Sequence, residues 1–354
     1  MRNTVVDKSK DSIGRLVHTY NPRTWKEKGL LWTSGLMLVT CIVIVVVLGI
    51  FWSREPAPFD VQEVALEQAD NDESKLVPGF ATTATTIRVA ETLLDKPGGY
   101  LTNDKLPPGV YLDNIPNWEF GVLTHVRDFT RAMRNDFSRS QTQSVEDKDL
   151  AVAQPQFNYD NNSWILPSSE SEYRKGIEAL YRYRDRLADE NARDGQFFTR
   201  ADNLRRYLEE VGTRLGGLAQ NLAASVGELR IDTNLAGDPN ARQSTPTPAV
   251  DRVKTPWLQI DDVFYEARGF TWGLMHTLEA IQIDFADVLR DKNAVVSLKQ
   301  VIRELEGAQE PMWSPMVLNG TGFGPLANHS LVMASYVSRA NAALIDLRDL
   351  LRQG

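Results

Sequence analysis

The feature that most constrains this chain is an uncharged apolar stretch near its N-terminus, residues 30–52, LLWTSGLMLVTCIVIVVVLGIFW. A helix needs roughly 20 consecutive apolar residues to cross the hydrocarbon core of a bilayer. Trp32 and Trp52 lie near the two ends of the stretch, where interfacial aromatic residues are typical of membrane helices. A buried helix of a soluble protein rarely lacks a polar face over such a length. The stretch therefore predicts one transmembrane helix.

Charged residues are distributed asymmetrically about this stretch. Basic residues outnumber acidic ones in residues 1–28, whereas acidic residues dominate residues 54–80. Because basic loops stay in the cytoplasm, we expect the N-terminus inside and the rest of the chain outside, which in a Gram-negative cell is the periplasm. A cleaved signal peptide is the alternative, but the basic region and the apolar run are both too long for one. We predict an uncleaved signal anchor in the bacterial inner membrane.

The charge and the cysteine content exclude several classes of function. The chain has a net charge of −8, and the acidic surplus lies in the part that follows the anchor. Nucleic-acid binding, and a domain lying flat on anionic lipid, both require basic patches instead. The only cysteine, Cys41, lies inside the apolar stretch. The part outside the membrane therefore cannot form a disulfide, and it has no thiolate for a metal site.

Changes in composition divide the chain into segments. Two linkers are expected, one acidic and mobile or weakly helical, the other rich in Pro, Thr and Asn. The predicted segments are a cytoplasmic tail (1–28), the anchor (29–53), an acidic linker (54–80), a first helical part (81–233), a second linker (234–256) and a second helical part (257–354).

The fold class follows from the spacing of apolar residues outside the membrane. These residues recur three to four positions apart, which predicts helices, and no alternating strand pattern of any length occurs. The predicted helices are residues 82–95, 117–137, 169–193, 199–231, 257–291, 295–306 and 328–353. The helix over 257–291 is apolar on two faces and is expected to be central. We predict a mostly α protein, an elongated periplasmic helical bundle with a long proline-rich loop over residues 100–116.

One predicted helix carries a heptad pattern. Its repeating apolar positions are Leu204, Leu208, Val211, Leu215, Leu218, Leu222 and Leu229. Such a pattern is typical of a coiled coil. It favours an antiparallel pair with the helix over 169–193 in the same domain. A projecting coiled-coil hairpin that docks another protein, or a homodimer, is the alternative.

Two histidines offer the clearest pattern for metal binding. His276 and Glu279 are one helical turn apart, and His125 and Asp128 repeat that spacing. A bundle that brings them together would complete a site with another carboxylate, for which the candidates are Glu266 and Asp284. The alternative is that each histidine is a hydrogen-bonded core residue. Apart from this metal, no cofactor is expected, because nucleophile motifs and phosphate-binding glycine loops are absent from the sequence.

Two stretches carry a resemblance to a known family. They are GGYLTNDKLPPGVYLDNIPNWEFGVL, residues 98–123, and DDVFYEARGFTWGLMHTLEAIQIDF, residues 261–285. The chain resembles a family of bacterial inner-membrane proteins classed as a domain of unknown function. The resemblance covers nearly the whole chain and implies a Gram-negative envelope protein with one N-terminal anchor. It implies no activity and no site residues.

Three hypotheses about function remain at this point. The first is a non-enzymatic envelope protein whose helical domain binds another envelope protein or a second copy of itself. The second is a metal-dependent envelope enzyme that uses His276, Glu279 and His125. The third is a ligand sensor, which would have to signal through a partner because a tail of residues 1–28 has no room for a domain of its own.

Overall fold

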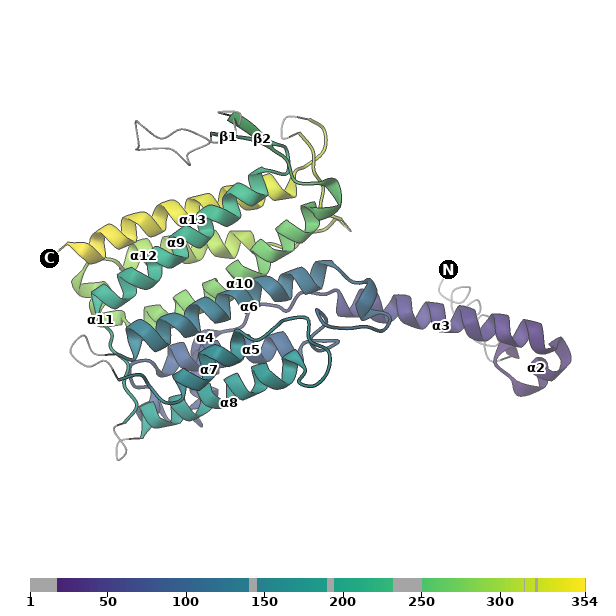
Figure 1. Ribbon diagram of the computed structural model, residues 1–354, viewed down its shortest axis with the longest axis horizontal. Helices are drawn as coiled ribbons and strands as arrows, with labels where there is room; N and C mark the ends of the chain where they lie inside the picture. Colours follow the sequence, from purple (N-terminus) through teal and green to yellow (C-terminus); the bar gives the residue numbers. More distant parts are fainter. Residues whose placement is uncertain are drawn as a thin grey trace, which may run out of the picture.

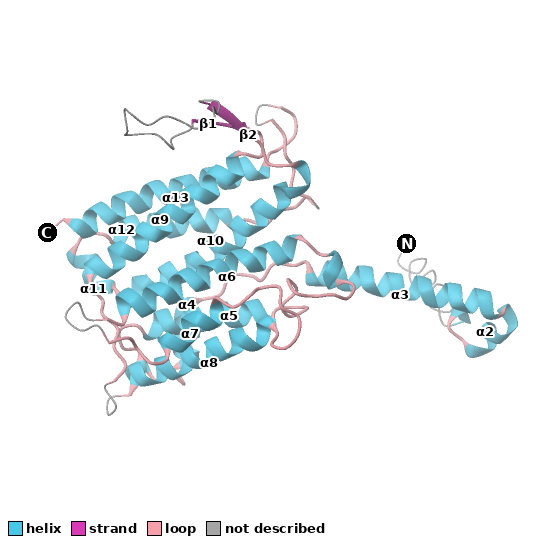
Figure 2. Ribbon diagram, viewed as in Figure 1, coloured by secondary structure: helices cyan, strands magenta, loops and turns pink. Residues whose placement is uncertain are grey.

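The computed structural model describes residues 18–353, apart from 140–144, 190–193, 232–249, 315 and 322–323. Helices dominate these residues, as the sequence predicts, and the strands among them form one small pair (Figure 2). The elements are α2 (Pro22–Lys28), α3 (Leu30–Trp52), α4 (Val61–Gln68), η1 (Glu73–Lys75), α5 (Phe80–Asp95), η2 (Gly109–Tyr111), α6 (Asn114–Ala132), η3 (Met133–Phe137), α7 (Leu150–Phe157), α8 (Ser169–Ala188), α9 (Ala201–Ala223), β1 (Glu228–Ile231), β2 (Val250–Val253), η4 (Trp257–Gln259), α10 (Ile260–Asp284), α11 (Ala286–Asp291), α12 (Val295–Ala308) and α13 (His329–Arg352).

Helix α3 is formed by the apolar stretch and projects from one end of the helical domain (Figure 1). Its most apolar window is only 6% buried, so its side chains do not form the core of a soluble fold. Among the residues described, it is the one helix long and apolar enough to cross a membrane. The predicted tail lies mostly in residues 1–17, which are outside the described residues.

The domain is arranged around α10. Helix α10 packs against α6 and α5 on one side and against α12 on the other, and α9, α12 and α13 form a layer of their own (Figure 1). Close packing of α6 on α10 requires glycine, because a Cβ atom at Gly269 would overlap the backbone carbonyl of Trp118. Helix α10 is therefore the central helix of the domain, as the sequence predicts.

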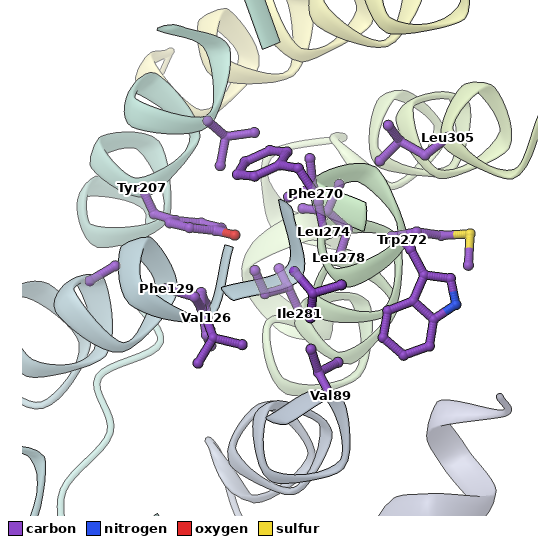
Figure 3. Packing of buried hydrophobic residues seen from close by; sticks show 14 of the residues in the cluster. Val89, Val126, Phe129, Tyr207, Phe270, Trp272, Leu274, Leu278, Ile281 and Leu305 are labelled. Atoms are coloured by element: carbon purple, nitrogen blue, oxygen red, sulfur yellow. The ribbon is translucent and has the colours of Figure 1, made fainter. Parts of the chain in front are cut away.

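Both predicted helical parts contribute to a continuous core. Figure 3 shows Phe270, Leu274, Leu278 and Ile281 of α10 between side chains of α5, α6, α9 and α12. The neighbours labelled there are Val89, Val126, Phe129, Tyr207 and Leu305. Each fully buried side chain of this size contributes roughly 1.5–3 kcal/mol.

The helix predicted over residues 257–291 is interrupted. Helix α10 ends at Asp284, and α11 begins at Ala286 after a non-helical Phe285, with φ −101° and ψ 19°. The Phe285 ring lies edge-on to Phe137 and Phe197. The Asp284 carboxylate accepts hydrogen bonds from the backbone and hydroxyl of Thr82. These contacts hold the chain at the point where the apolar periodicity alone predicts a continuous helix.

The predicted pairing of the helices over 169–193 and 199–231 is wrong. Helix α8 packs on α7 and α5, whereas α9 packs on α13. The heptad positions of α9 from Leu204 to Leu222 are buried within this domain. Helix α9 ends at Ala223, and Leu229 belongs to strand β1. The heptad pattern identified the buried face of α9 but not the helix that covers it.

The acidic segment over residues 54–80, expected to be mobile or weakly helical, contains a short helix that packs on the domain. Helix α4 lies in this segment. The Asp60 side chain caps its N-terminus by accepting a hydrogen bond from the backbone amide of Glu63. Val61, Val64 and Ala65 are buried. Their spacing of three and four lets α4 bury one face on α5, although the segment as a whole is acidic.

Two short strands were not predicted, and one of them lies inside the second predicted linker. Strands β1 and β2 form an antiparallel pair in which Glu228 lies opposite Val253. Four-residue strands are too short to give a visible alternation in the sequence. Most of the linker predicted over 234–256 lies outside the described residues.

The proline-rich loop is ordered, as expected, although α6 begins at Asn114, three positions before the predicted start. The buried Glu119 carboxylate of α6 holds the loop. It accepts hydrogen bonds from the backbone amides of Leu101 (2.9 Å) and Thr102 (2.8 Å), and it pairs with the buried Lys96 ammonium. A paired and hydrogen-bonded carboxylate satisfies loop amides that would otherwise be buried without partners.

Candidate functional site

The segment that follows α3 is bound to the centre of the domain through Arg268. The Arg268 guanidinium pairs with Glu55, with an Nε to Oε2 distance of 2.8 Å. The same guanidinium donates to the carbonyls of Ala308 (3.1 Å) and Glu310 (3.0 Å). Arg268 is only 7% exposed, so water does little to solvate its charge. These protein groups compensate the charge instead. Arg268 therefore connects the end of α3, the central helix and the end of α12.

A second contact of this segment involves one of the predicted metal ligands. The Phe59 ring stacks on the His276 imidazole, with centroids 3.9 Å apart. The Phe59 amide donates to His276 Nε2 (3.1 Å), and His276 Nδ1 lies 2.7 Å from the carbonyl oxygen of Trp272. A carbonyl only accepts, so we assign the proton to Nδ1. We call Glu55, Phe59, Arg268 and His276 the juxtamembrane contact.

Burial keeps both buried histidines neutral. It lowers the pKa of His276 to about 4 and that of His125 to about 3, with the proximity of His276 as a second, smaller cause for His125. His125 Nε2 lies 2.8 Å from the Thr277 hydroxyl. Both nitrogens of His276 are occupied by protein partners. A metal would have to displace the Phe59 amide to bind at Nε2.

Glu279 lies at the surface of the domain, whereas His276 is buried. Burial, followed by the charges of Glu306 and Asp60, raises the pKa of Glu279 to about 7. It lines a shallow groove with Lys299 and Arg303 of α12. Within the residues described, no group of three or more histidine, cysteine, aspartate or glutamate side chains is placed to hold a metal ion. The metal site at His276, Glu279 and His125 stays a prediction, without an assembled ligand set to support it.

The two remaining carboxylates proposed as ligands have separate surroundings. Asp284, the last residue of α10, places its carboxylate against the first turn of α5, where burial raises its pKa to about 6 while the hydrogen bonds from Thr82 oppose the rise. Glu266 lies in a groove instead, and burial raises its pKa as well. Neither carboxylate lies beside His276 in a common site.

The groove beside Glu266 is lined by charged residues and has a volume of about 540 Å³. It lies between α6, α9 and α10. Two ion pairs border it, from Arg214 to Asp128 (2.8 Å) and from Arg131 to Glu210 (2.9 Å). We call these four residues, together with Glu266, the charged groove. The groove contains both signs of charge. It also borders Gly217 of α9, where a Cβ atom would meet no other atom within 4 Å.

A smaller cavity lies next to Arg268. Its volume is about 330 Å³, and its walls are mainly apolar. They include Phe264, Met312, Trp313, Met333 and Tyr336. His329, at the start of α13, also lines it, and its Nδ1 accepts a hydrogen bond from the Leu318 amide (3.0 Å). We call this the Arg268 cavity.

The comparison with protein families agrees with the architecture described above. A family described as an uncharacterized protein conserved in bacteria (DUF2333) matches residues 25–354. The chain belongs to this family. The match begins before α3 and continues through α13, so the family includes the apolar helix together with the whole helical domain. No curated protein and no solved structure matches the chain.

The family match confirms the resemblance stated from residues 98–123 and 261–285, but it assigns no site residues. Sequence reasoning missed Glu55, Phe59 and Arg268. One signal was present, because Arg268 is a lone basic residue on a helix that is apolar on two faces. A charge in that position needs a buried partner. The partner itself is 213 positions away, and no local pattern identifies it.

Proposed function

We propose that this protein is a single-pass inner-membrane protein with a cytoplasmic N-terminus and a periplasmic helical domain. The basic tail and the acidic segment on either side of α3 support this orientation. The end of α3 also supports an uncleaved anchor. The Trp52 ring packs over Gly98, and Gly49 lies against Pro108 and Leu112. Cleavage after the apolar stretch would remove side chains that pack on the domain.

The proposed role of the domain is to bind and organise another envelope component without catalysis. The juxtamembrane contact is the observation that carries this proposal. A flexible linker suits a domain that searches for diffusing substrates over a wide radius. A domain fixed to the end of its anchor instead presents one face at one height above the membrane. That arrangement suits a protein that holds a partner in a defined position.

The charged groove is the surface that we assign to the partner. It is bordered by exposed ion pairs of both signs, which favour a partner whose own surface carries complementary charges. Partly buried Glu266 gives the groove a desolvated carboxylate for a hydrogen-bond donor. The adjacent open surface at Gly217 allows close approach of a backbone.

Site-specific crosslinking in the native membrane tests this role. A photoreactive residue replaces Asn221, which lines the charged groove. The matched control carries the same residue at Val296, which is exposed at the start of α12. Tagged full-length protein is then purified in mild detergent, alongside a form that lacks residues 1–53. The proposal predicts one reproducible crosslinked partner from position 221 that is absent from position 296.

The anchorless form makes the result specific to the proposed geometry. The proposed partner is held at the membrane. The yield of the crosslinked partner should therefore fall when residues 1–53 are removed. A groove that crosslinks only to its own chain, with a single band after purification, would contradict the role in partner binding.

A ligand sensor is a second candidate, because the Arg268 cavity has a direct connection to α3. Arg268 borders the cavity and pairs with Glu55, which follows the end of α3. A ligand that draws Arg268 away from Glu55 would release the end of α3. In cells with a defined loss-of-protein phenotype, deletion of residues 2–20 should then reproduce that phenotype. A deletion with no effect would contradict signalling through the tail.

A further inference from the structure

The tip of the proline-rich loop lies beside the last turn of α3. A Cβ atom placed on Gly49 of α3 would lie within van der Waals contact of Pro108 and Leu112, which flank η2. Trp52, the last residue of α3, packs over Gly98 at the beginning of the same region. The loop tip is therefore level with the end of the apolar helix, and α6 begins directly behind it (Figure 1).

The loop tip exposes apolar side chains at this level. Tyr111 is 75% exposed, and Leu106 and Val110 are also exposed. We call Leu106, Val110 and Tyr111 the loop tip. Asn117 of α6 bonds to Asp262 of α10 (2.6 Å), so both helices begin at the same end of the domain. There η4 adds two further exposed side chains, Trp257 and Leu258.

We propose that the loop tip inserts into the bilayer interface next to α3. A tyrosine flanked by aliphatic residues is the composition that favours the boundary between headgroups and hydrocarbon. The contact with α3 places these residues at that boundary when α3 spans the membrane. The occupant of this apolar surface is therefore lipid, and the inference rests on the proposed anchor.

Apolar insertion also agrees with the charge of the domain. Asp104, Lys105 and Asp113 flank the loop tip and leave it with one net negative charge, and the chain as a whole is acidic. Anionic headgroups would repel such a surface, so attraction to them cannot drive the contact. We expect the insertion to occur in vesicles of zwitterionic phosphatidylcholine and to be insensitive to salt.

Fluorescence quenching in reconstituted vesicles tests the inference. The full chain, with Cys41→Ser as background, receives one labelled cysteine through Tyr111→Cys. Val296→Cys is the matched control, because Val296 is 76% exposed at the start of α12, away from the end where α3 joins the domain (Figure 1). The protein with its native Cys41 labelled reports whether α3 itself is in the bilayer. Nitroxide-bearing phosphatidylcholine and aqueous iodide are the two quenchers.

The inference predicts that nitroxide lipid quenches the label at position 111 and that iodide does not. The label at position 296 should respond in the opposite way. A label at 111 that behaves like the one at 296, while Cys41 is quenched by lipid, would overturn the insertion but leave the anchor intact. Protection of position 111 from both quenchers would also overturn it, because protein would then cover the loop tip. A Cys41 label open to iodide would overturn the anchor and the insertion together.

Discussion

Arg268 connects parts of the domain that are distant in the sequence. It joins Glu55 after α3 to the carbonyl oxygens at the end of α12. Desolvation of a guanidinium is tolerated only when such partners compensate its charge. Arg268 and the stacked pair of Phe59 and His276 are therefore the residue-scale basis for a fixed juxtamembrane segment.

The first prediction concerns this arginine. Arg268→Ala leaves Glu55 and the carbonyl oxygens of α12 without their donor, and we expect a loss of about 3–5 kcal/mol in the free energy of unfolding. Arg290→Ala is the matched control, since Arg290 and Asp287 form an exposed ion pair. Its expected loss is below about 0.5 kcal/mol. Urea unfolding of the full-length protein in detergent, followed by circular dichroism, measures both. Equal losses would contradict the importance of the buried pair.

The second prediction distinguishes a structural Glu279 from a metal ligand. The pKa of Glu279 in the folded protein is about 7, above its ordinary value of 4.5, so the folded state binds its proton more tightly. Ionised Glu279 therefore destabilises the fold above pH 7, and this penalty disappears as the pH falls to 4.5. We expect Glu279→Gln to stabilise the protein by roughly 1–2 kcal/mol at pH 8, after allowing for partial exposure.

The same variant at pH 4 serves as its own control. Glu279 is then protonated in the folded and the unfolded state, so the stability gained by Glu279→Gln should vanish. A loss of stability at pH 8, reproduced in the unmodified protein by a chelator, would contradict this account and favour the metal site. Unfolding curves at the two pH values, with metal analysis of the purified protein, decide between these results.

At the scale of elements, the close approach of α6 and α10 fixes the centre of the domain. The backbones meet at Gly269, where a Cβ atom would overlap the Trp118 carbonyl. Gly217 of α9, in contrast, has nothing within 4 Å of its position for a Cβ atom. The same residue type therefore has opposite roles in two helices.

The third prediction uses this pair of glycines. Gly269→Ala should destabilise the protein by about 1–3 kcal/mol, because α6 and α10 would have to separate. Gly217→Ala should stabilise it by about 0.5–1 kcal/mol, through the higher helix propensity of alanine. Thermal unfolding of both variants in one detergent gives the two signs. A stabilising Gly269→Ala would show that the two helices are not in contact.

The sequence is informative about elements where periodicity determines structure. Helices α5, α12 and α13 form close to the predicted residues, because each has one apolar face and distinct end signals. The partner of α9 was not predictable, since a heptad pattern identifies a buried face and not the helix that covers it. The break at Phe285 was missed for a similar reason. It depends on contacts with Thr82, Phe137 and Phe197 that are distant in sequence.

At the scale of the whole molecule, α3 and the helical domain are connected without a free linker. The acidic composition of residues 54–80 predicted a mobile or weakly helical segment, and α4 in fact buries three apolar residues while Phe59 stacks on His276. Composition averages over a segment, whereas a few well-placed apolar residues are enough to bind it to the domain. The apolar helix α3 could be predicted from the sequence alone, because its apolar run is uninterrupted. The juxtamembrane contact could not, since it joins residues more than two hundred positions apart.

The fourth prediction tests the fixed connection itself. Two nitroxide labels, one at the native Cys41 in α3 and one at Asn221→Cys in α9, report the distance between α3 and the domain by double electron–electron resonance. The full-length protein is measured in lipid nanodiscs. We predict one narrow distance distribution, which broadens in the Arg268→Ala variant because the juxtamembrane contact is then lost. A broad distribution in the protein with Arg268 intact would contradict the account, since the domain would then move freely on its anchor.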